Sequence, residues 1–383
     1  MFEGRMNRRA VVGLSALALL AGCQVIPKGA PQPQPTPTGP SEELPADKAR
    51  HRIALLVPLS GTNGALGQSF ANATTMALLD TNAQNIRITT YDTANGPAAA
   101  ATKAVQDGAK LILGPLQAGE VAPVAAVARA AKVPLISYVS DASLAARDVF
   151  VMGTAPGNSI ERTVEFASKQ GLRRFALLVP NGDYGARARG AFAAAVAASG
   201  GTLVNTLGYD RSNTSVISTA QRLKAKGGFD AVLIADGARI AAMAAPSLKP
   251  ATGAGPRLLG TELWSGEATL TKAPALRGAW FAAISDSRFA RFAESYKARF
   301  SAAPFRASTL GYDSVLLTVR IAREWKPGTP FPTARLTDTG GFLGLDGPFR
   351  FSADGVIERA LEVREVRSGT FAVVGPAAEK FAD

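Results

Sequence analysis

The chain contains the stretch Arg52-Ile-Ala-Leu-Leu-Val-Pro58 and repeats it almost unchanged as Arg174-Phe-Ala-Leu-Leu-Val-Pro180. Each copy is a run of apolar residues closed by a proline, which is typical of a strand buried on both faces of a parallel sheet. Each run leads into a turn that contains glycine, Ser60–Gly64 after the first and Asn181–Gly185 after the second. The repeat therefore predicts one fold built twice rather than a solenoid of short units.

Short apolar segments alternate with amphipathic helices through the rest of the body. We expect strands at 53–57, 86–90, 110–113 and 134–136, and again at 174–179, 202–206, 231–234, 257–259 and 278–281. This alternation predicts an α/β fold with doubly wound parallel sheets that helices cover on both faces. A body of roughly 330 residues exceeds what one hydrophobic core usually supports, so we expect two lobes joined by a hinge.

The expected lobe boundaries follow the repeat. The first lobe takes residues 51–170 and, after the chain crosses back, residues 282–335, whereas the second lobe takes residues 171–281. The tail, 336–383, lacks the alternation of strands and helices. Its Ala353-Asp354-Gly355 reads as a hairpin turn between two apolar segments, so we expect a C-terminal β-hairpin element that packs beside the hinge.

The N-terminal segment has the layout of a signal peptide. Three arginines precede an apolar run, Ala10–Ala21, that is too short to span a bilayer. The run leads into Leu20-Ala21-Gly22-Cys23, which resembles the bacterial lipobox. We expect residues 1–22 to be removed as a lipoprotein signal peptide and Cys23 to be acylated. A free thiol behind an ordinary signal peptide is the alternative.

Residues 23–50 are expected to tether the body to a membrane. The segment Pro27–Pro45 is rich in proline and has no apolar periodicity, which favours an extended, semi-rigid chain. Gln24, rather than aspartate, follows the cysteine, and the resemblance to lipoproteins then favours the outer membrane over the inner one. We therefore expect a periplasmic protein that a lipid anchor holds to the cell envelope.

Composition argues against several classes of partner. The chain carries a formal net charge of +12, which favours anionic surroundings such as lipid headgroups or wall polymers. Its basic residues are dispersed and lack interleaved aromatic residues, so we expect no nucleic-acid partner. The only histidine, His51, borders the tether, and the only cysteine is the expected acylation site, so we expect no metal site.

Catalytic motifs are missing or misplaced. Gly67-Gln68-Ser69-Phe70-Ala71 partly imitates the nucleophile elbow of hydrolases, but it lies inside a predicted helix rather than at a strand exit. No Gly-Lys-Ser/Thr phosphate loop occurs, and His51 is badly placed to activate a serine. We expect a binding protein that is not an enzyme and carries no cofactor.

Seven motifs in the same order resemble the type I periplasmic binding proteins, specifically the branch that binds leucine and amides. They are Leu56–Gly61, Tyr91–Thr93, Gly114-Pro115, Val133–Ser137, Asp183–Gly185, Leu310–Asp313 and Phe342–Gly347. The body also resembles lipid-anchored members of this fold called penicillin-binding protein activators, which regulate cell-wall synthases. The resemblance covers nearly the whole body and implies two lobes that close on a ligand around a hinge.

The resemblance and the sheet geometry imply the same ligand position. In open α/β sheets, ligands bind beyond the carboxyl ends of the strands, where backbone N–H groups and hydroxyls stabilise a carboxylate. In the first lobe the contacts implied by motif match are Ser60, Gly61, Gln117, Ser137 and Ser140. In the second lobe they are Tyr184, then Glu262 as the acid that pairs with a ligand ammonium, and Asp236 as a second candidate acid.

Simpler structural roles are open to the same residues. Ser60 can belong to the turn that follows Pro58, and Ser137 can cap the next helix. Tyr184 can pack between the lobes, and Glu262 can be a solvated side chain. In addition, Tyr138-Val139 is bulky where the family usually has small residues, which can narrow or close the pocket.

Two functions remain open on the sequence alone. The first is a lipid-anchored solute-binding protein that takes an amino acid, an amide or a peptide-like ligand and serves an importer permease or a sensor. The second is a non-enzymatic activator of a penicillin-binding protein, which regulates a peptidoglycan synthase through protein contacts. An open, polar cavity large enough for an amino acid would favour the first function.

Overall fold

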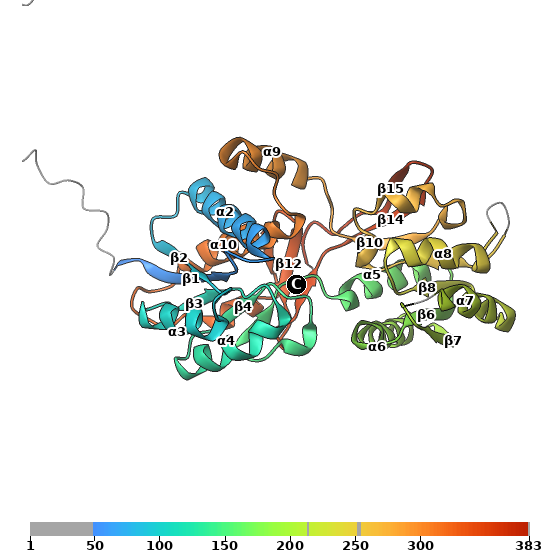
Figure 1. The fold of residues 1–383 in the computed structure, drawn as a ribbon, viewed down its shortest axis with the longest axis horizontal. Helices are drawn as coiled ribbons and strands as arrows, with labels where there is room; N and C mark the ends of the chain where they lie inside the picture. Colours follow the sequence, from blue (N-terminus) through green and yellow to red (C-terminus); the bar gives the residue numbers. More distant parts are fainter. Residues whose placement is uncertain (1–48, 213, 251–253, 382–383) are drawn as a thin grey trace, which may run out of the picture. The chain divides into compact units, whose positions relative to one another are not determined.

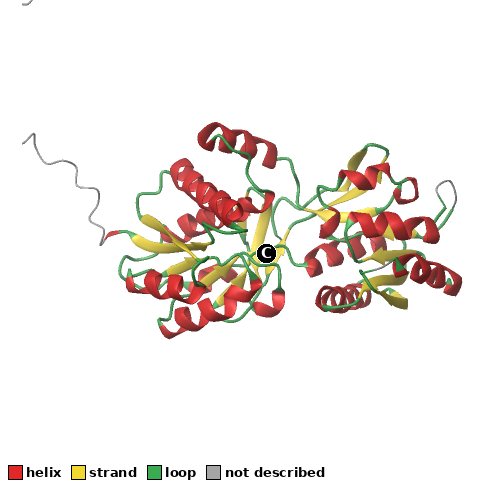
Figure 2. Cartoon of the chain, viewed as in Figure 1, coloured by secondary structure: helices red, strands yellow, loops and turns green. Residues whose placement is uncertain are grey.

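The computed structural model describes residues 49–212, 214–250 and 254–381 (Figure 1). The expected signal peptide, the acylated Cys23 and nearly all of the tether lie outside these residues. Within the described part of the chain, no helix is both long and apolar enough to cross a membrane. The described residues form two lobes, each built on its own sheet with helices against it (Figure 2).

The first lobe has a five-stranded sheet of order β2-β1-β3-β4-β5, in which every neighbouring pair is parallel. Its strands are β1 (His51–Val57), β2 (Ile86–Asp92), β3 (Leu111–Leu113), β4 (Leu135–Ser137) and β5 (Val149–Val151). Its helices are α2 (Gly64–Thr81), α3 (Pro97–Gln106), α4 (Ala118–Ala130), α9 (Phe289–Phe300) and α10 (Thr309–Ala322). The predicted alternation of strands and helices is confirmed here.

The second lobe has a seven-stranded sheet of order β15-β14-β10-β9-β8-β6-β7. Its parallel strands are β6 (Arg174–Pro180), β7 (Thr202–Tyr209), β8 (Ala231–Ile234), β9 (Arg257–Leu259) and β10 (Trp280–Ala283). Its helices are α5 (Pro156–Lys169), α6 (Asp183–Ala198), α7 (Ser215–Lys226) and α8 (Ala238–Leu248). Both lobes therefore have the parallel α/β architecture that the repeated stretch predicts.

The two repeated strands lie inside their sheets and bury both faces. In β1, Ile53 and Leu55 belong to one core cluster while Ala54 belongs to the cluster on the other face. In β6, Phe175 and Ala176 divide between two clusters in the same way. Because successive side chains of a strand point to opposite faces, a continuous apolar run is what a sheet covered by helices on both sides requires.

Two predicted boundaries were wrong. The helix α5 was expected to close the first lobe, but its Ile160, Val164 and Ala167 pack with the β6 side chains of the second lobe. The tail was expected to pack beside the hinge, but β14 (Glu362–Arg367) joins the second sheet antiparallel to β10, and β15 (Thr370–Gly375) continues it antiparallel to β14. An amphipathic pattern shows that a segment is half-buried, but not which sheet it covers.

The predicted hairpins themselves are confirmed. A small antiparallel sheet of β11 (Phe342–Gly344), β12 (Gly347–Phe351) and β13 (Ile357–Arg359) packs its aromatic side chains into the core of the first lobe. The chain consequently passes between the lobes three times, near 153–155, near 284–288 and at 360–361.

A buried ion pair holds the small sheet to α10. The side chains of Asp313 and Arg359 are 0% and 1% exposed, and their charged atoms lie 3.5 Å apart. Asp313 also accepts hydrogen bonds from the backbone N–H groups of Leu345 and Asp346. Burial raises the pKa of Asp313 to about 7, because the carboxylate has lost water and lies near Asp346. Removing one partner of such a pair leaves an uncompensated charge, which is strongly destabilising.

In each lobe, one helix approaches the end of the preceding strand very closely. A Cβ atom on Gly67 in α2 would overlap the carbonyl oxygen of Pro58, and a Cβ on Gly185 in α6 would overlap that of Pro180. Only glycine lets the first turns of each helix approach the end of its preceding strand so closely. This contact fixes where the helix begins relative to the carboxyl edge of the sheet.

We expect Gly185→Ala to destabilise the second lobe by about 1–3 kcal/mol, because the new methyl group meets a backbone oxygen that cannot rotate away. Gly190→Ala in the same helix is the matched control, since a Cβ there meets nothing within 4 Å. Alanine favours an exposed helical position by up to about 1 kcal/mol, so the control should unfold at the wild-type urea concentration or above it. Equal unfolding midpoints for the two variants would contradict the close approach.

Candidate functional site

One cavity of about 630 Å³ is lined by residues of both lobes. Its walls come mainly from segments that follow the carboxyl ends of β4, β5, β6, β9 and β10, as expected for a ligand site in parallel sheets. Apolar side chains include those of Tyr138, Leu263, Ile284, Leu310 and Leu361. Polar groups include those of Ser140, Asp141, Thr154, Tyr184, Arg187, Glu262, Arg306, Thr309 and Asp346.

Glu262 contributes a carboxylate to this wall that is only partly hydrogen-bonded. Its Oε1 accepts a hydrogen bond of 3.1 Å from the Tyr184 hydroxyl, whereas its Oε2 is buried and has no hydrogen-bond partner among the described residues. Burial raises the pKa of Glu262 to about 7, because the ionised carboxylate has lost its water. A buried carboxylate oxygen without a donor is stabilised by any cation that reaches it.

Tyr184 is held in position by a short chain of hydrogen bonds. Its hydroxyl lies 3.0 Å from the Thr261 hydroxyl and donates to Glu262, so Thr261 can donate in turn to Tyr184. The guanidinium of Arg211 lies over the Tyr184 ring, 5.2 Å from its centre. Burial and the Glu262 carboxylate raise the pKa of Tyr184 well above its usual range, so the hydroxyl keeps its proton. Tyr184 therefore acts as a donor to Glu262.

Arg187 joins the two lobes at the cavity wall. Its Nη1 lies 3.2 Å from Oδ2 of Asp141, which belongs to the first lobe. Its Nε is buried and has no hydrogen-bond partner among the described residues. Asp141 also accepts hydrogen bonds from the Ser143 hydroxyl and N–H, which lower the pKa of Asp141. The wall thus carries an N–H donor without an acceptor as well as a carboxylate oxygen without a donor.

Arg306 is charged but already partnered. Its Nη1 donates to Asp346 at 2.8 Å, and its Nε lies 3.5 Å from Asp286. Asp346 is buried and accepts a second hydrogen bond from the Thr309 hydroxyl. This cluster continues through the backbone N–H of Asp346 to the buried Asp313. Arg306 therefore stabilises the cavity wall through its ion pairs and adds no unpaired charge to it.

Three of the predicted contacts meet at the cavity. Ser140, Tyr184 and Glu262 all line it, the first from one lobe and the other two from the other. Tyr138 also lines it, and its ring packs against Phe70 with ring centres 4.8 Å apart. The Tyr138 side chain therefore packs into the core of the first lobe and leaves the cavity open.

The other predicted contacts do not line this cavity and are occupied in local structure. Ser60 donates to the Asp92 carboxylate in the exposed turn that also holds Gly61, and Gln117 donates to Glu120 on the surface at the start of α4. Ser137 is fully buried and donates to the Pro115 carbonyl. The carboxylate of Asp236 accepts hydrogen bonds from Tyr209, from Arg211 and from the N–H of Gly237. Asp236 therefore neutralises Arg211, the cation over Tyr184.

The polar wall residues missing from the prediction include Asp141, Thr154, Arg187, Arg306, Thr309 and Asp346. Arg187 stands three residues after Tyr184, and this spacing places two side chains on one face of a helix. Asp141 directly follows Ser140 in the turn after β4. Thr154 lies where the chain first passes between the lobes, and no sequence pattern signals that crossing. Among the described residues, no three His, Cys, Asp or Glu side chains are grouped as a metal site would require.

Comparison with known proteins identifies the relatives of this chain. Residues 51–370 match the family model of periplasmic binding proteins. A curated relative, the uncharacterised protein RP748 of Rickettsia prowazekii, is 29% identical over 134 residues, which are 34% of this chain and 36% of that protein. The match therefore spans about a third of the length of that relative.

Solved structures share the fold at low sequence identity. A protein of Rhodospirillum rubrum, described as a branched-chain amino acid ABC transporter, has a TM-score of 0.74 at 20% identity, with coverage of 85% of this chain and 100% of that one. LivJ of Streptococcus pneumoniae, in complex with isoleucine, has a TM-score of 0.57 at 21% identity, covering 85% and 100%. A solute-binding protein of R. palustris, in complex with benzoate, has a TM-score of 0.57 at 20% identity, covering 87% and 98%.

The raised pKa of Glu262 has a defined consequence for stability without ligand. The folded protein holds the Glu262 proton more tightly than the unfolded chain does, so this residue destabilises the fold as the pH rises from about 4.5 to about 7. We expect Glu262→Gln to raise the thermal unfolding midpoint at pH 8 and to leave it nearly unchanged at pH 4. Glu267→Gln, an exposed glutamate of the same loop, should change neither value. A Glu262→Gln effect that is equal at both pH values would contradict the burial of this charge.

Proposed function

The chain belongs to the periplasmic binding protein family, and we propose that it is a lipid-anchored envelope receptor that binds a small amino-acid-like solute in the cavity between its lobes. The observation that carries this proposal is the Glu262 carboxylate in the cavity wall, whose buried Oε2 has no donor among the described residues. A receptor of this kind delivers its solute to an importer permease or a sensor.

Glu262 selects the cationic end of the ligand. An ammonium group at Oε2 would supply the missing hydrogen bond and neutralise the buried charge, which favours the ionised carboxylate. Tyr184 already donates to Oε1 and so leaves Oε2 to the ligand. A neutral or anionic solute offers no such pairing, so we infer that the ligand carries an amine.

Arg187 supports an anionic end for the same ligand. Arg187 lines the same cavity as Glu262, and its buried Nε has no acceptor among the described residues. A ligand carboxylate there would add a charge-assisted hydrogen bond to a guanidinium that Asp141 only partly satisfies. The hydroxyls of Ser140 and Thr154 lie in the wall of the first lobe and offer further donors to that carboxylate. A ligand that carries both the ammonium and the carboxylate is a zwitterion.

The size and lining of the cavity support a small ligand. Its volume of about 630 Å³ falls within the range of ordinary ligand pockets. Its apolar walls, from Tyr138, Ile284, Leu310 and Leu361, leave room for an uncharged side chain. Relatives that share the fold were solved with isoleucine and with leucine bound. We therefore propose an apolar amino acid, its amide or a short peptide-like molecule as the solute.

The regulator of a peptidoglycan synthase stays the alternative role, since a lipid anchor and a tether would suit both functions. The open cavity with its two unsatisfied charged groups supports the receptor, because a purely protein-binding regulator has no need to keep them. An unoccupied cavity that binds no small molecule would shift the proposal to the synthase regulator.

Calorimetric titration against a panel of amino acids, amides and dipeptides tests the ligand class. We expect at least one zwitterion to bind, and Glu262→Gln to weaken it by about 10- to 100-fold, because a buried charged hydrogen bond contributes roughly 1.5–3 kcal/mol. Glu267→Gln is the control and should keep wild-type affinity. Affinity should also fall as the pH drops below about 7, because the Glu262 proton then competes with the ammonium. Wild-type affinity in Glu262→Gln would contradict this ligand orientation.

The lipid anchor has a separate test. Cells that express the full chain and are fed an alkyne-labelled fatty acid should incorporate the label, and Cys23→Ser should abolish incorporation because the chain has one cysteine. Tether substitutions such as Gln34→Ala should leave labelling unchanged. Label on the Cys23→Ser protein would contradict the proposed anchor. So would wild-type protein without label in a strain that labels a known lipoprotein. Neither result would bear on the proposed ligand site.

A further inference from the structure

The first lobe carries a group of exposed cations at the amino ends of its strands. Because β1–β5 are all parallel, these amino ends lie along one edge of the sheet. The His51 ring at the start of β1 stacks on Trp325, with ring centres 3.7 Å apart, which brings the chain after α10 to the same edge. We define the basic edge as Lys110, Lys132, Arg147, Arg323 and Lys326, all exposed.

The charges of the basic edge are not compensated. None of its five side chains forms an ion pair or a hydrogen bond with another described residue. The carboxylates nearby are already engaged, Asp107 with Lys103 at 2.6 Å, Asp148 with Arg129 at 2.8 Å, and Glu324 with Arg335. The basic edge therefore forms a surface with a net positive charge.

Part of the basic edge is hollowed. Lys132 and Arg147 line a groove of about 520 Å³ together with Arg129, whose charge is matched by two hydrogen bonds of 2.8 Å to Asp148. Two unpaired cations thus border one recess that is large enough for a phosphate-bearing headgroup. Cations of this kind attract anionic groups, and the attraction is screened by salt.

We propose that the basic edge docks on the anionic phospholipid surface to which the chain is tethered. This inference rests in part on the proposed lipid anchor, since the described chain begins at residue 49, two residues before β1 at this same edge. Each Lys or Arg near an anionic membrane contributes about 1 kcal/mol, so five of them favour the docked state once the anchor holds the body nearby.

Docking by this edge has a consequence for ligand access. The wall segments that the first lobe contributes after β4 and β5 follow the carboxyl ends of these strands, at the opposite end of the sheet from the basic edge. A membrane at the amino ends therefore leaves that side of the cavity free for solute. The surface charge would orient the receptor relative to the membrane.

Vesicle co-sedimentation of residues 45–383 tests this surface, because this part forms one compact unit that contains the cores of both lobes. It lacks Cys23 and needs no ligand, so neither acylation nor solute binding affects the result. The probe is vesicles of phosphatidylcholine with about a third phosphatidylglycerol, against phosphatidylcholine alone, at moderate salt. We expect binding to the anionic vesicles only, and weaker binding as salt increases.

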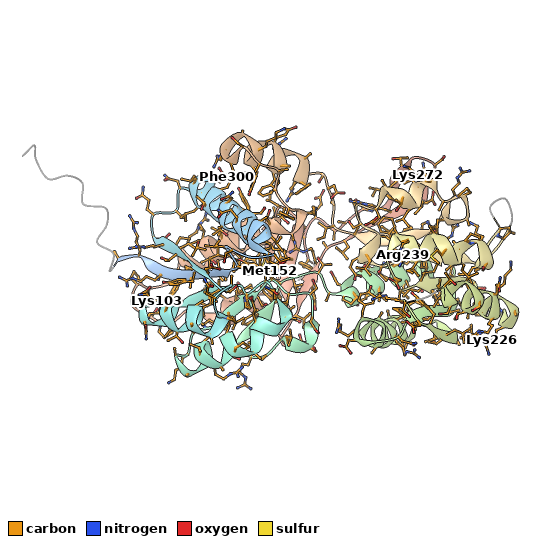
Figure 3. All side chains as sticks on the ribbon, viewed as in Figure 1. Lys103, Met152, Lys226, Arg239, Lys272 and Phe300 are labelled. Carbon is orange, nitrogen blue, oxygen red and sulfur yellow. The ribbon has the colours of Figure 1, made fainter. Side chains whose placement is uncertain are left out.

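The edge variant Lys132→Ala/Arg147→Ala/Lys326→Ala removes three of the five cations. Its partition coefficient should fall at least about tenfold, since each charge contributes roughly 1 kcal/mol. The matched control, Lys224→Ala/Lys226→Ala/Lys272→Ala, removes the same charge from exposed sites of the second lobe, where Figure 3 labels Lys226 and Lys272. The control should bind within about twofold of wild type.

Four outcomes would overturn the proposal. Equal losses in the two variants would mean that only net charge matters. An edge variant that unfolds at lower temperature but partitions like wild type would assign these cations to stabilising the ends of the nearby helices. Displacement by inorganic phosphate beyond that of sodium chloride at equal ionic strength would assign the groove to a soluble anion. Should the edge variant fail to fold, salt-independent partition of the wild type contradicts the proposal equally.

Discussion

The position of the cavity depends on how closely the helix that follows each repeated strand, α2 after β1 and α6 after β6, approaches the end of that strand. Gly67 lies against the carbonyl of Pro58 in the first lobe, and Gly185 lies against the carbonyl of Pro180 in the second. In the second lobe this contact places the start of α6 beside the carboxyl edge of the sheet, where Tyr184 and its neighbours reach the cavity. A side chain at either glycine would push the helix away from that edge.

Buried charge fixes the wall of the first lobe in a different way. Asp313 on α10 pairs with Arg359 at the end of β13 and binds the backbone that leads to Asp346. Asp346 in turn binds Arg306 and Thr309, both in the cavity wall. Because Arg359 stands just before the chain enters the second lobe at 360–361, one electrostatic cluster links a lobe crossing to the site. Both carboxylate oxygens of Asp313 and of Asp346 accept hydrogen bonds within this cluster, whereas Oε2 of Glu262 has no donor among the described residues.

The strands were predictable because a strand buried on both faces requires a continuous run of apolar residues in the sequence. The two copies of the apolar stretch became β1 and β6, each inside its sheet. Helix α5 could not be assigned to the right lobe, since Ile160 and Val164 show only that one face is covered. The same limit applied to β14, whose apolar residues fit the expected hairpin beside the hinge as well as an added strand of the second sheet.

The site was only partly predictable, because the sequence does not show which polar side chains are already hydrogen-bonded to their neighbours. Tyr184 and Glu262 follow the ends of β6 and β9, where parallel sheets place their ligands, and both line the cavity. Asp236 follows β8 and has the same sequence signature, but Tyr209 and Arg211 satisfy its carboxylate. Nothing in the sequence distinguishes an acid with internal partners from one without them. Arg187 was missed because its role depends on Asp141 in the other lobe.

The central claim is that Glu262 holds the cationic end of a small solute in the cavity between the lobes. Native mass spectrometry of the body, after equilibration with a mixture of amino acids and short peptides, tests it most directly. We expect one bound molecule per chain, released on denaturation and identified as an amine with a carboxylate, and we expect Glu262→Gln to lose it. A wild-type spectrum that shows only the unliganded mass under these conditions, or an adduct that persists in Glu262→Gln, would contradict the account.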